Sequence, residues 1–233
     1  ITTLREAAED DSIAGLKGFG AKSQQRMLDG IELLARFRSR RRLDIGLKYG
    51  EAFEQRIAKI PGVQKAQLAG SARRRKDTIG DLDLVVAVED KDKESVSNAI
   101  LQLPGIADIK GAGDSKISLI LDTSIFDENF SIGHIDTNVL DAIGGDDYEQ
   151  LEAGGTIDAQ VRLVSLEVFP FTLAYFTGSK EHNIAMRQRA IDRGLRLSEF
   201  GLIPEKDAGD LKGMAAAKFS LNAIDENEIY RHL

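Results

Sequence analysis

The sequence predicts an α+β fold in which a mixed sheet with flanking helices stands between a helical hairpin and a small, mostly helical C-terminal part. Three observations lead to this prediction. Apolar residues recur at helical spacing over the first 45 residues. Strand patterns and helical patterns then alternate between residues 46 and 168, and helical patterns return from residue 169 onward.

Composition narrows the kind of protein and the kind of metal site that the sequence allows. No run of eighteen apolar residues is present, so no contact with a membrane is expected. Cysteine is absent and histidine is scarce, so a metal site would be built from carboxylates, which favour Mg²⁺ or Mn²⁺. The three histidines are expected to be surface or packing residues: His134, His182 and His232. Because it starts at Ile1, the sequence is expected to be an excerpt of a longer protein with further domains.

The first 45 residues are expected to form two helices joined by a turn. One helical face is marked by four apolar residues, Met27, Leu28, Ile31 and Leu34. Residues 16–22 precede them and contain two glycines, which permit a tight turn of the backbone. The segment is therefore interpreted as a helical hairpin.

Strands and helices alternate in the middle of the chain. Two helical stretches each stop at a Pro-Gly pair, Pro61–Gly62 and Pro104–Gly105. Strands are expected at residues 64–68, 81–88, 116–121 and 159–164. The segment of about 122–156, with two Gly-Gly pairs, is expected to be an insertion in the sheet.

The charge distribution favours a nucleic-acid partner, although the net charge is −7. Ten acidic residues and no Lys or Arg lie between Asp122 and Asp158. Elsewhere basic residues outnumber acidic ones, and they gather at residues 36–42 and 73–76. Such clusters suit phosphate backbones, although either cluster alone is equally compatible with a solvated helix end.

The strongest chemical signal lies between Gly70 and Asp83. Asp81 and Asp83 are two residues apart in an expected strand, so both carboxylates point to one face. Two such carboxylates could bridge a pair of metal ions for phosphoryl chemistry. Upstream, Gly70 and Ser71 open a helical turn whose N–H groups and hydroxyl could hold a phosphate, and Arg74 would add a charged contact.

This stretch resembles the palm motif of the family X DNA polymerases, which belong to the polymerase beta-like nucleotidyltransferases. The motif has the form Gly-Ser-x-Arg-Arg followed by Gly-Asp-x-Asp, at the spacing found here. The resemblance implies that Asp81 and Asp83 are the catalytic residues and bind both metals. It also implies that the incoming nucleotide is held by four further residues: Gly70, Ser71, Arg74 and Gly80.

A second motif, Tyr-Phe-Thr-Gly-Ser at residues 175–179, resembles the turn at the palm–thumb junction of the same family. The resemblance implies that Tyr175, Phe176 and Gly178 contribute to nucleotide binding by packing on the sugar. Taken alone, the aromatic pair would more often belong to an apolar core.

The helix after this turn carries two further candidates. Ser179 is suited to cap a helix that runs through about Asp192. Asn183 and Arg187 are four residues apart and share one face of that helix. By resemblance, Asn183 contacts the incoming base and Arg187 contacts the minor groove of the template.

The turn at residues 16–22 resembles the helix-hairpin-helix element of bacterial family members. Gly18 and Gly20 let the backbone turn so that N–H groups face a DNA phosphate, and Lys22 supplies charge. Such a contact grips the backbone without reading bases. The resemblance implies three parts: a helix-hairpin-helix at 1–45, a palm at 46–168 with the insertion at about 122–156, and a thumb at 169–233.

One departure from the family pattern concerns a third carboxylate. The family has an Asp sixteen residues before the Phe of the turn, which by resemblance holds the catalytic metal and accepts the proton of the primer hydroxyl. Gln160 occupies this position, and its neutral amide can do neither well. Asp158, two residues upstream, is a further metal candidate if the strand register differs. Weakened catalysis within an unchanged fold is therefore expected.

The predicted function is DNA-directed DNA synthesis in gap-filling repair. Its substrates would be gapped or primer–template DNA and deoxynucleoside triphosphates, with two Mg²⁺ or Mn²⁺ ions, at the nucleoid of a prokaryotic cytoplasm. One alternative is a non-catalytic module that binds DNA gaps or ends and incorporates no nucleotide. Another is a nucleotidyltransferase with a different acceptor, such as RNA or a small molecule; the hairpin and the thumb-like motif argue against it.

Overall fold

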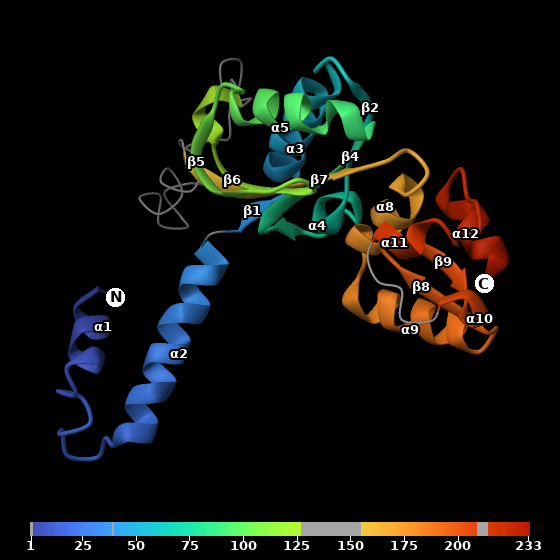
Figure 1. The fold of residues 1–233 in the computed structure, drawn as a ribbon. Helices are drawn as coiled ribbons and strands as arrows, with labels where there is room; N and C mark the ends of the chain where they lie inside the picture. Colours follow the sequence, from blue (N-terminus) through green and yellow to red (C-terminus); the bar gives the residue numbers. More distant parts are fainter. Residues whose placement is uncertain (1, 39, 127–154, 209–213) are drawn as a thin grey trace. The chain divides into compact units, whose positions relative to one another are not determined.

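The computed structural model describes residues 2–38, 40–126, 155–208 and 214–233 (Figure 1). The chain divides into two compact units, Ile1–Arg41 and Arg42–Leu233. Most of the acidic insertion expected at about 122–156 lies outside the described residues, as does His134. Within the described part, no helix combines the length and the apolar character that crossing a membrane requires.

The first unit is a hairpin of two helices, α1 (Thr2–Glu9) and α2 (Ala21–Arg38), as the sequence predicts. The buried side chain of Gln24 fastens the loop between them. Its amide nitrogen donates to a carboxylate oxygen of Asp11 at 2.6 Å, and its carbonyl oxygen accepts from the backbone N–H of Ala14 at 2.9 Å. A buried amide with both ends hydrogen-bonded holds the loop in one conformation.

A five-stranded mixed sheet forms the centre of the second unit, with the strand order β2-β4-β7-β6-β5. Strand β4 runs parallel to β7, and the other neighbouring pairs are antiparallel. The strands are β2 (Val63–Leu68), β4 (Asp81–Val88), β5 (Ile106–Ala112), β6 (Lys116–Asp122) and β7 (Thr156–Val164). The shorter elements are β1 (Arg41–Arg42), which spans the boundary of the two units in the sequence, and β3 (Thr78–Ile79), η1 (Asp90–Asp92) and η2 (Thr123–Phe126).

The sequence predicts four strands of this sheet but not β5. Strand β5 lies at the edge, and six of its seven residues are exposed. With neither face buried, its sequence has no need to alternate apolar and polar side chains, and alternation is the signal that identifies a strand.

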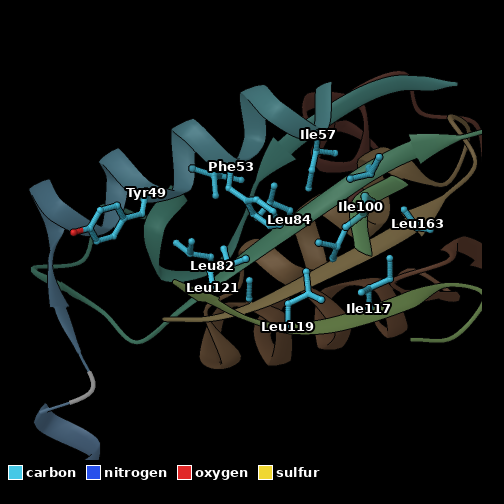
Figure 2. Packing of buried hydrophobic residues seen from close by; sticks show 14 of the residues in the cluster. Tyr49, Phe53, Ile57, Leu82, Leu84, Ile100, Ile117, Leu119, Leu121 and Leu163 are labelled. Carbon is cyan, nitrogen blue, oxygen red and sulfur yellow. The ribbon is translucent and has the colours of Figure 1, made fainter. Parts of the chain in front are cut away.

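One face of the sheet packs against α3 (Leu43–Ala58) and α5 (Lys93–Leu101) to form the main core (Figures 1 and 2). Phe53 of α3 lies over Leu82 and Leu84 of β4, and all three side chains are buried. Because successive residues of a strand point to opposite faces, Asp81 and Asp83, which alternate with these leucines, face away from the core.

The opposite face of the sheet is covered only in part. Val85 and Ala87 of β4 pack against Leu173 of α8 (Phe169–Thr177) in a second apolar cluster. The short helix α4 (Gly70–Arg73) contacts β4 near the start of that strand. The beginning of β4 therefore borders polar surroundings, whereas its end is buried on both faces.

The C-terminal part packs around a third apolar cluster that includes Phe171, Leu202 and Ile229. Its elements after α8 are α9 (Lys180–Ile191), β8 (Leu195–Ser198), β9 (Gly201–Pro204), α10 (Glu205–Ala208), α11 (Met214–Ala217) and α12 (Glu226–His232). The hydroxyl of Ser179 caps α9 by accepting from the backbone N–H of His182 at 3.4 Å, as predicted. The hairpin of β8 and β9 is an addition to the mostly helical prediction, because four-residue strands are too short to show a period.

Replacing Phe53 by alanine is expected to lower the free energy of unfolding by about 3–5 kcal/mol, because it removes a buried aromatic ring and leaves a cavity. Phe53 is 1% exposed, whereas Phe219 is 51% exposed and serves as the matched control. Phe219→Ala is expected to change stability by less than about 0.5 kcal/mol. Urea denaturation followed by circular dichroism measures both; equal effects would contradict the assignment of the core.

Candidate functional site

The open face of the sheet carries the predicted carboxylates. Asp81 and Asp83 lie at alternate positions of β4, on the face away from the main core. The parallel register of β4 and β7 pairs Asp81 with Asp158 and Asp83 with Gln160. Side chains that are paired across adjacent strands share a face. Asp83 therefore has the amide of Gln160 as its neighbour on β7, and Asp81 has the carboxylate of Asp158.

Gly70 allows the backbone of α4 to approach Asp83 closely. Gly70 adopts a φ of +58, and a side chain at this position would overlap the Asp83 carboxylate. The backbone carbonyl of Asp83 in turn accepts from the N–H of Ala69 at 2.7 Å. Only glycine satisfies both the positive φ and the close approach without strain. The Gly-Ser motif and the carboxylate motif thus meet in space.

The carboxyl group of Asp83 is in an unfavourable environment for a negative charge. Burial, and next the charge of Asp81, raise its pKa from 3.8 to about 6, while Arg162, Arg74 and Lys116 act in the opposite direction. A buried carboxylate beside a second carboxylate is a common arrangement at functional sites. A bound cation would remove the penalty for ionising Asp83.

Two polar atoms on the turn that begins at Gly70 are buried without a hydrogen-bond partner among the described residues: Ser71 Oγ and Arg74 Nε. Unsatisfied buried polar groups are rare, since each one costs stability. Another nitrogen of the Arg74 guanidinium donates to the backbone carbonyl of Thr177. Gly178 lies beside the same guanidinium and adopts a φ of +67, a conformation that favours glycine. Gly80 forms the bend directly before β4.

Arg73 joins α4 to the C-terminal part and was not singled out as a site residue by sequence reasoning. Its guanidinium binds both carboxylate oxygens of Glu226 on α12, at 2.7 and 2.5 Å, and donates to Thr177 Oγ1 at 2.8 Å. Paired, partly buried contacts of this kind are stronger than single ones. Arg73 and Arg74 together thus attach the Gly-Ser turn to the segment around Thr177.

Arg162 is a second residue that sequence reasoning left without a role. Its guanidinium lies over the ring of Phe176, 4.4 Å from the ring centre, and its Nε is buried without a partner among the described residues. It also lies near enough to Asp83 to lower the pKa of that carboxyl group. The position of the arginine, two residues after Gln160 on β7, was the available signal, but the partner of the arginine is set by the fold.

The predicted nucleotide-binding turn and helix lie together in the C-terminal part. The rings of Tyr175 and Phe176 meet edge to face, with centres 5.3 Å apart. Asn183 donates from its side chain to the backbone carbonyl of Tyr175 at 2.7 Å, and Arg187 donates to the carbonyl of Asn183 at 3.3 Å. Tyr175, Asn183 and Arg187 border one small cavity of about 20 Å³. Asn183 and Arg187 therefore lie on one surface, as their spacing predicts, and Tyr175 borders the same cavity.

Asp158 does not join the other two carboxylates. It forms an ion pair with Lys110, with 2.7 Å between the ammonium and the carboxylate. In the described ranges, no three His, Cys, Asp or Glu side chains are grouped closely enough to hold a metal ion. His182 instead contacts the hydroxyl of Tyr230 at 3.3 Å. The slipped register that would bring Asp158 opposite Asp83 is not observed.

The predicted DNA-binding residues of the hairpin lie in the first unit. Gly18 adopts a φ of +94 in the loop before α2, and Lys22 lies in the first turn of that helix. The backbone carbonyl of Gly20 accepts from the N–H groups of Ser23 and Gln24 at 2.8 and 3.1 Å. The side chains of Arg36 and Arg38, in the predicted basic cluster, lie outside the described residues.

Known proteins resemble the chain in sequence and in structure. The family model of the DNA polymerase beta thumb matches residues 172–233. The "DNA polymerase/3'-5' exonuclease PolX" of Bacillus subtilis is 31% identical over 230 residues, covering 99% of this chain. The chain spans 33% of the length of that relative.

Two solved structures of Leishmania infantum polymerase beta share the fold. One, a ternary P/T complex, matches with a TM-score of 0.63 and 17% identity over 92% of this chain and 90% of its own. The other, a ternary gap complex, matches with a TM-score of 0.63 and 18% identity over 99% of this chain and 77% of its own. The fold and the matches agree on one class, the polymerase beta-like nucleotidyltransferases. Within that class, the chain resembles the family X DNA polymerases.

Asp83→Asn is expected to stabilise the metal-free protein above pH 6 by up to about 3 kcal/mol. The pKa of Asp83 is raised in the folded state, to about 6. Between about pH 4 and pH 6 the folded protein therefore keeps a proton that the unfolded chain has lost, and stability falls as the pH rises through this range. Asp83→Asn does not lose stability in this way, so the free energies of unfolding of the two proteins should become equal near pH 3.5.

Urea denaturation at pH 3.5 to 8 in the presence of a chelator measures this difference. Asp114→Asn, in the exposed turn between β5 and β6, is the control for the removal of one carboxylate from the protein. A stability difference between Asp83→Asn and the unmodified protein that does not vary with pH would show that the carboxyl group is not strained by its surroundings.

Proposed function

We propose that the chain transfers nucleotides from deoxynucleoside triphosphates to the 3' hydroxyl of a primer on gapped DNA. One observation carries this proposal: Ser71 Oγ and Arg74 Nε, buried without a hydrogen-bond partner among the described residues, lie on the turn that contacts Asp83 through Gly70. A phosphate beside the carboxylates would satisfy the hydroxyl and the guanidinium together. The polymerase names of the Bacillus subtilis and Leishmania infantum relatives support the same reaction.

Mg²⁺ or Mn²⁺ fits the residues of the site. Asp81 and Asp83 offer hard oxygen ligands on one face, and the raised pKa of Asp83 marks a carboxylate that a cation would stabilise. When bound, a pair of such ions would stabilise the charge on the phosphate oxygens of the reaction. Asp81 and Asp83 would be the ligands shared by both ions.

The incoming nucleotide would be held by residues at α4 and by residues of the C-terminal part. Ser71, Arg74 and the backbone of Gly70 and Gly80 would bind the triphosphate. The turn of Tyr175, Phe176 and Gly178 would pack on the sugar. Asn183 would meet the base of the incoming nucleotide, and Arg187 the minor groove of the template. Support comes from the hydrogen bonds that join Arg74 to Thr177 and Asn183 to Tyr175.

DNA would be gripped by the hairpin of the first unit as well. The positive φ of Gly18 and the position of Lys22 in the first turn of α2 favour a backbone contact there. We accordingly propose the division into a helix-hairpin-helix (1–45), a palm (46–168) and a thumb (169–233). The substrate and the bacterial relative favour a place at the nucleoid of a prokaryotic cytoplasm.

Gln160 favours a second candidate, a module that binds DNA gaps without incorporating nucleotides. The register sets this neutral amide opposite Asp83, at the position where the family pattern has its third carboxylate. An amide neither accepts a proton from a hydroxyl at neutral pH nor balances the charge of a cation. The two candidates differ in whether nucleotide incorporation is slow or absent.

Gln160→Asp is expected to raise the rate of incorporation on gapped primer–template DNA by about 10²–10⁴-fold, the usual contribution of a general base. Asp158→Asn is expected to have little effect, because Asp158 is paired with Lys110. Single-turnover extension of a labelled primer in Mg²⁺ and in Mn²⁺ measures both. Loss of activity in Asp158→Asn, without a gain in Gln160→Asp, would make Asp158 the third ligand. Zero activity in every variant would favour the binding module.

Lys22→Glu is expected to weaken binding to gapped DNA to a similar extent for unrelated sequences. The slope of log affinity against log salt concentration is expected to fall in magnitude by about one. Fluorescence anisotropy at several salt concentrations measures this. Lys91→Glu makes the same charge change in η1, beyond the end of β4 that lies away from the carboxylates, and is the matched control. Equal weakening by both variants would point to net charge rather than to a hairpin contact.

A further inference from the structure

The ion pair between Lys110 and Asp158 links the edge of the sheet to the carboxylate site. Lys110 belongs to β5, and β6 lies between β5 and the strand of Asp158. The ammonium nevertheless lies 2.7 Å from the carboxylate. The lysine side chain thus crosses the neighbouring strand to reach the face that carries Asp81 and Asp83.

Lys110 lies at a β-bulge in β5. Ile109 pairs with Leu119 and Gly111 with Ser118, so Lys110 falls at a register shift between β5 and β6. An extra residue in one strand bends that strand and re-aims a side chain, and such bulges are frequent next to active sites. The bulge in β5 therefore helps to set the direction of the Lys110 side chain.

Asp158 is the carboxylate that β7 places nearest to the pair on β4. It is directly opposite Asp81 in the parallel register, and adjacent strands lie about 4.8 Å apart. Two carboxylates at that spacing can share one cation. Gln160, the neighbour of Asp83, offers only a neutral oxygen. A cation bound at Asp81 would therefore gain its next charged ligand from Asp158, if Asp158 were free.

We propose that Lys110 is a positioning residue that holds Asp158 in an ion pair and withholds it from the cation bound by Asp81 and Asp83. This inference rests on the proposed function. The pair is about half exposed, 46% for Lys110 and 52% for Asp158, so its strength is modest and a cation competes with it directly. Removing the ammonium leaves Asp158 available as a third carboxylate.

The test is a double-mutant cycle with Mn²⁺ alone as the probe. Lys110→Met keeps the length of the side chain and removes its charge. The dissociation constant of Mn²⁺ is measured by electron paramagnetic resonance for the unmodified protein, Lys110→Met, Asp158→Asn and the double variant. We expect Lys110→Met to tighten binding by about three- to tenfold when Asp158 is present, from the modest strength of an exposed pair. In the Asp158→Asn background it should change binding by less than about 1.5-fold.

Lys91→Met is the matched control, because Lys91 also forms an exposed ion pair of 2.7 Å, with Glu89. It is expected to leave Mn²⁺ binding unchanged. Equal tightening by Lys110→Met in both backgrounds would show a general effect of charge and overturn the proposal, as would no tightening at all. Thermal melts verify that each variant is folded.

A further variant separates this proposal from the proposed function. Asp83→Asn should weaken Mn²⁺ binding strongly if the cation is held by the carboxylate pair. Binding that is unchanged in Asp83→Asn would overturn the proposed site itself. Binding that depends on Asp83 but not on Lys110 would overturn only the role of Lys110.

Discussion

The alternation of side chains along β4 is the constraint on which the rest of the site depends. Leu82 and Leu84 are buried under α3, so Asp81 and Asp83 must face the other way. A shift of one residue in that strand would bury both carboxylates in the apolar core, at a cost on the order of several kcal/mol for each charge. Burial of the leucines in the core thereby fixes the direction of the two carboxylates on the opposite face.

The surroundings of Asp83 lower the stability of the fold. The carboxyl group of Asp83 has a raised pKa, and Ser71 Oγ and Arg74 Nε lie buried without partners among the described residues. Each of these features destabilises the fold, and each would be relieved by a cation or a phosphate. The bidentate contact of Arg73 with Glu226 keeps the turn of α4 attached to α12 despite this cost.

Local pattern was sufficient for much of this architecture. The period of two along residues 81–88 predicted both the strand and the shared face of its aspartates, and Ser179 predicted the start of α9. The same reasoning did not find β5, where exposure removes the alternation, or the hairpin of β8 and β9, where the strands are too short for a period to show. The roles of the nucleotide- and DNA-binding residues came from resemblance, and they remain predictions.

By itself, the sequence determined which residues face the core and where the chemical motifs lie, because burial of one face leaves a periodic pattern in the chain. Only the tertiary structure decided which charged groups meet. Glu226 lies 153 residues from Arg73, and Asp158 lies 48 residues from Lys110. These partners depend on the order of the strands, on a bulge in β5 and on how the C-terminal helices close on α4. A charged side chain at a partly exposed position carries no local signal of its partner, since no periodic burial constrains it.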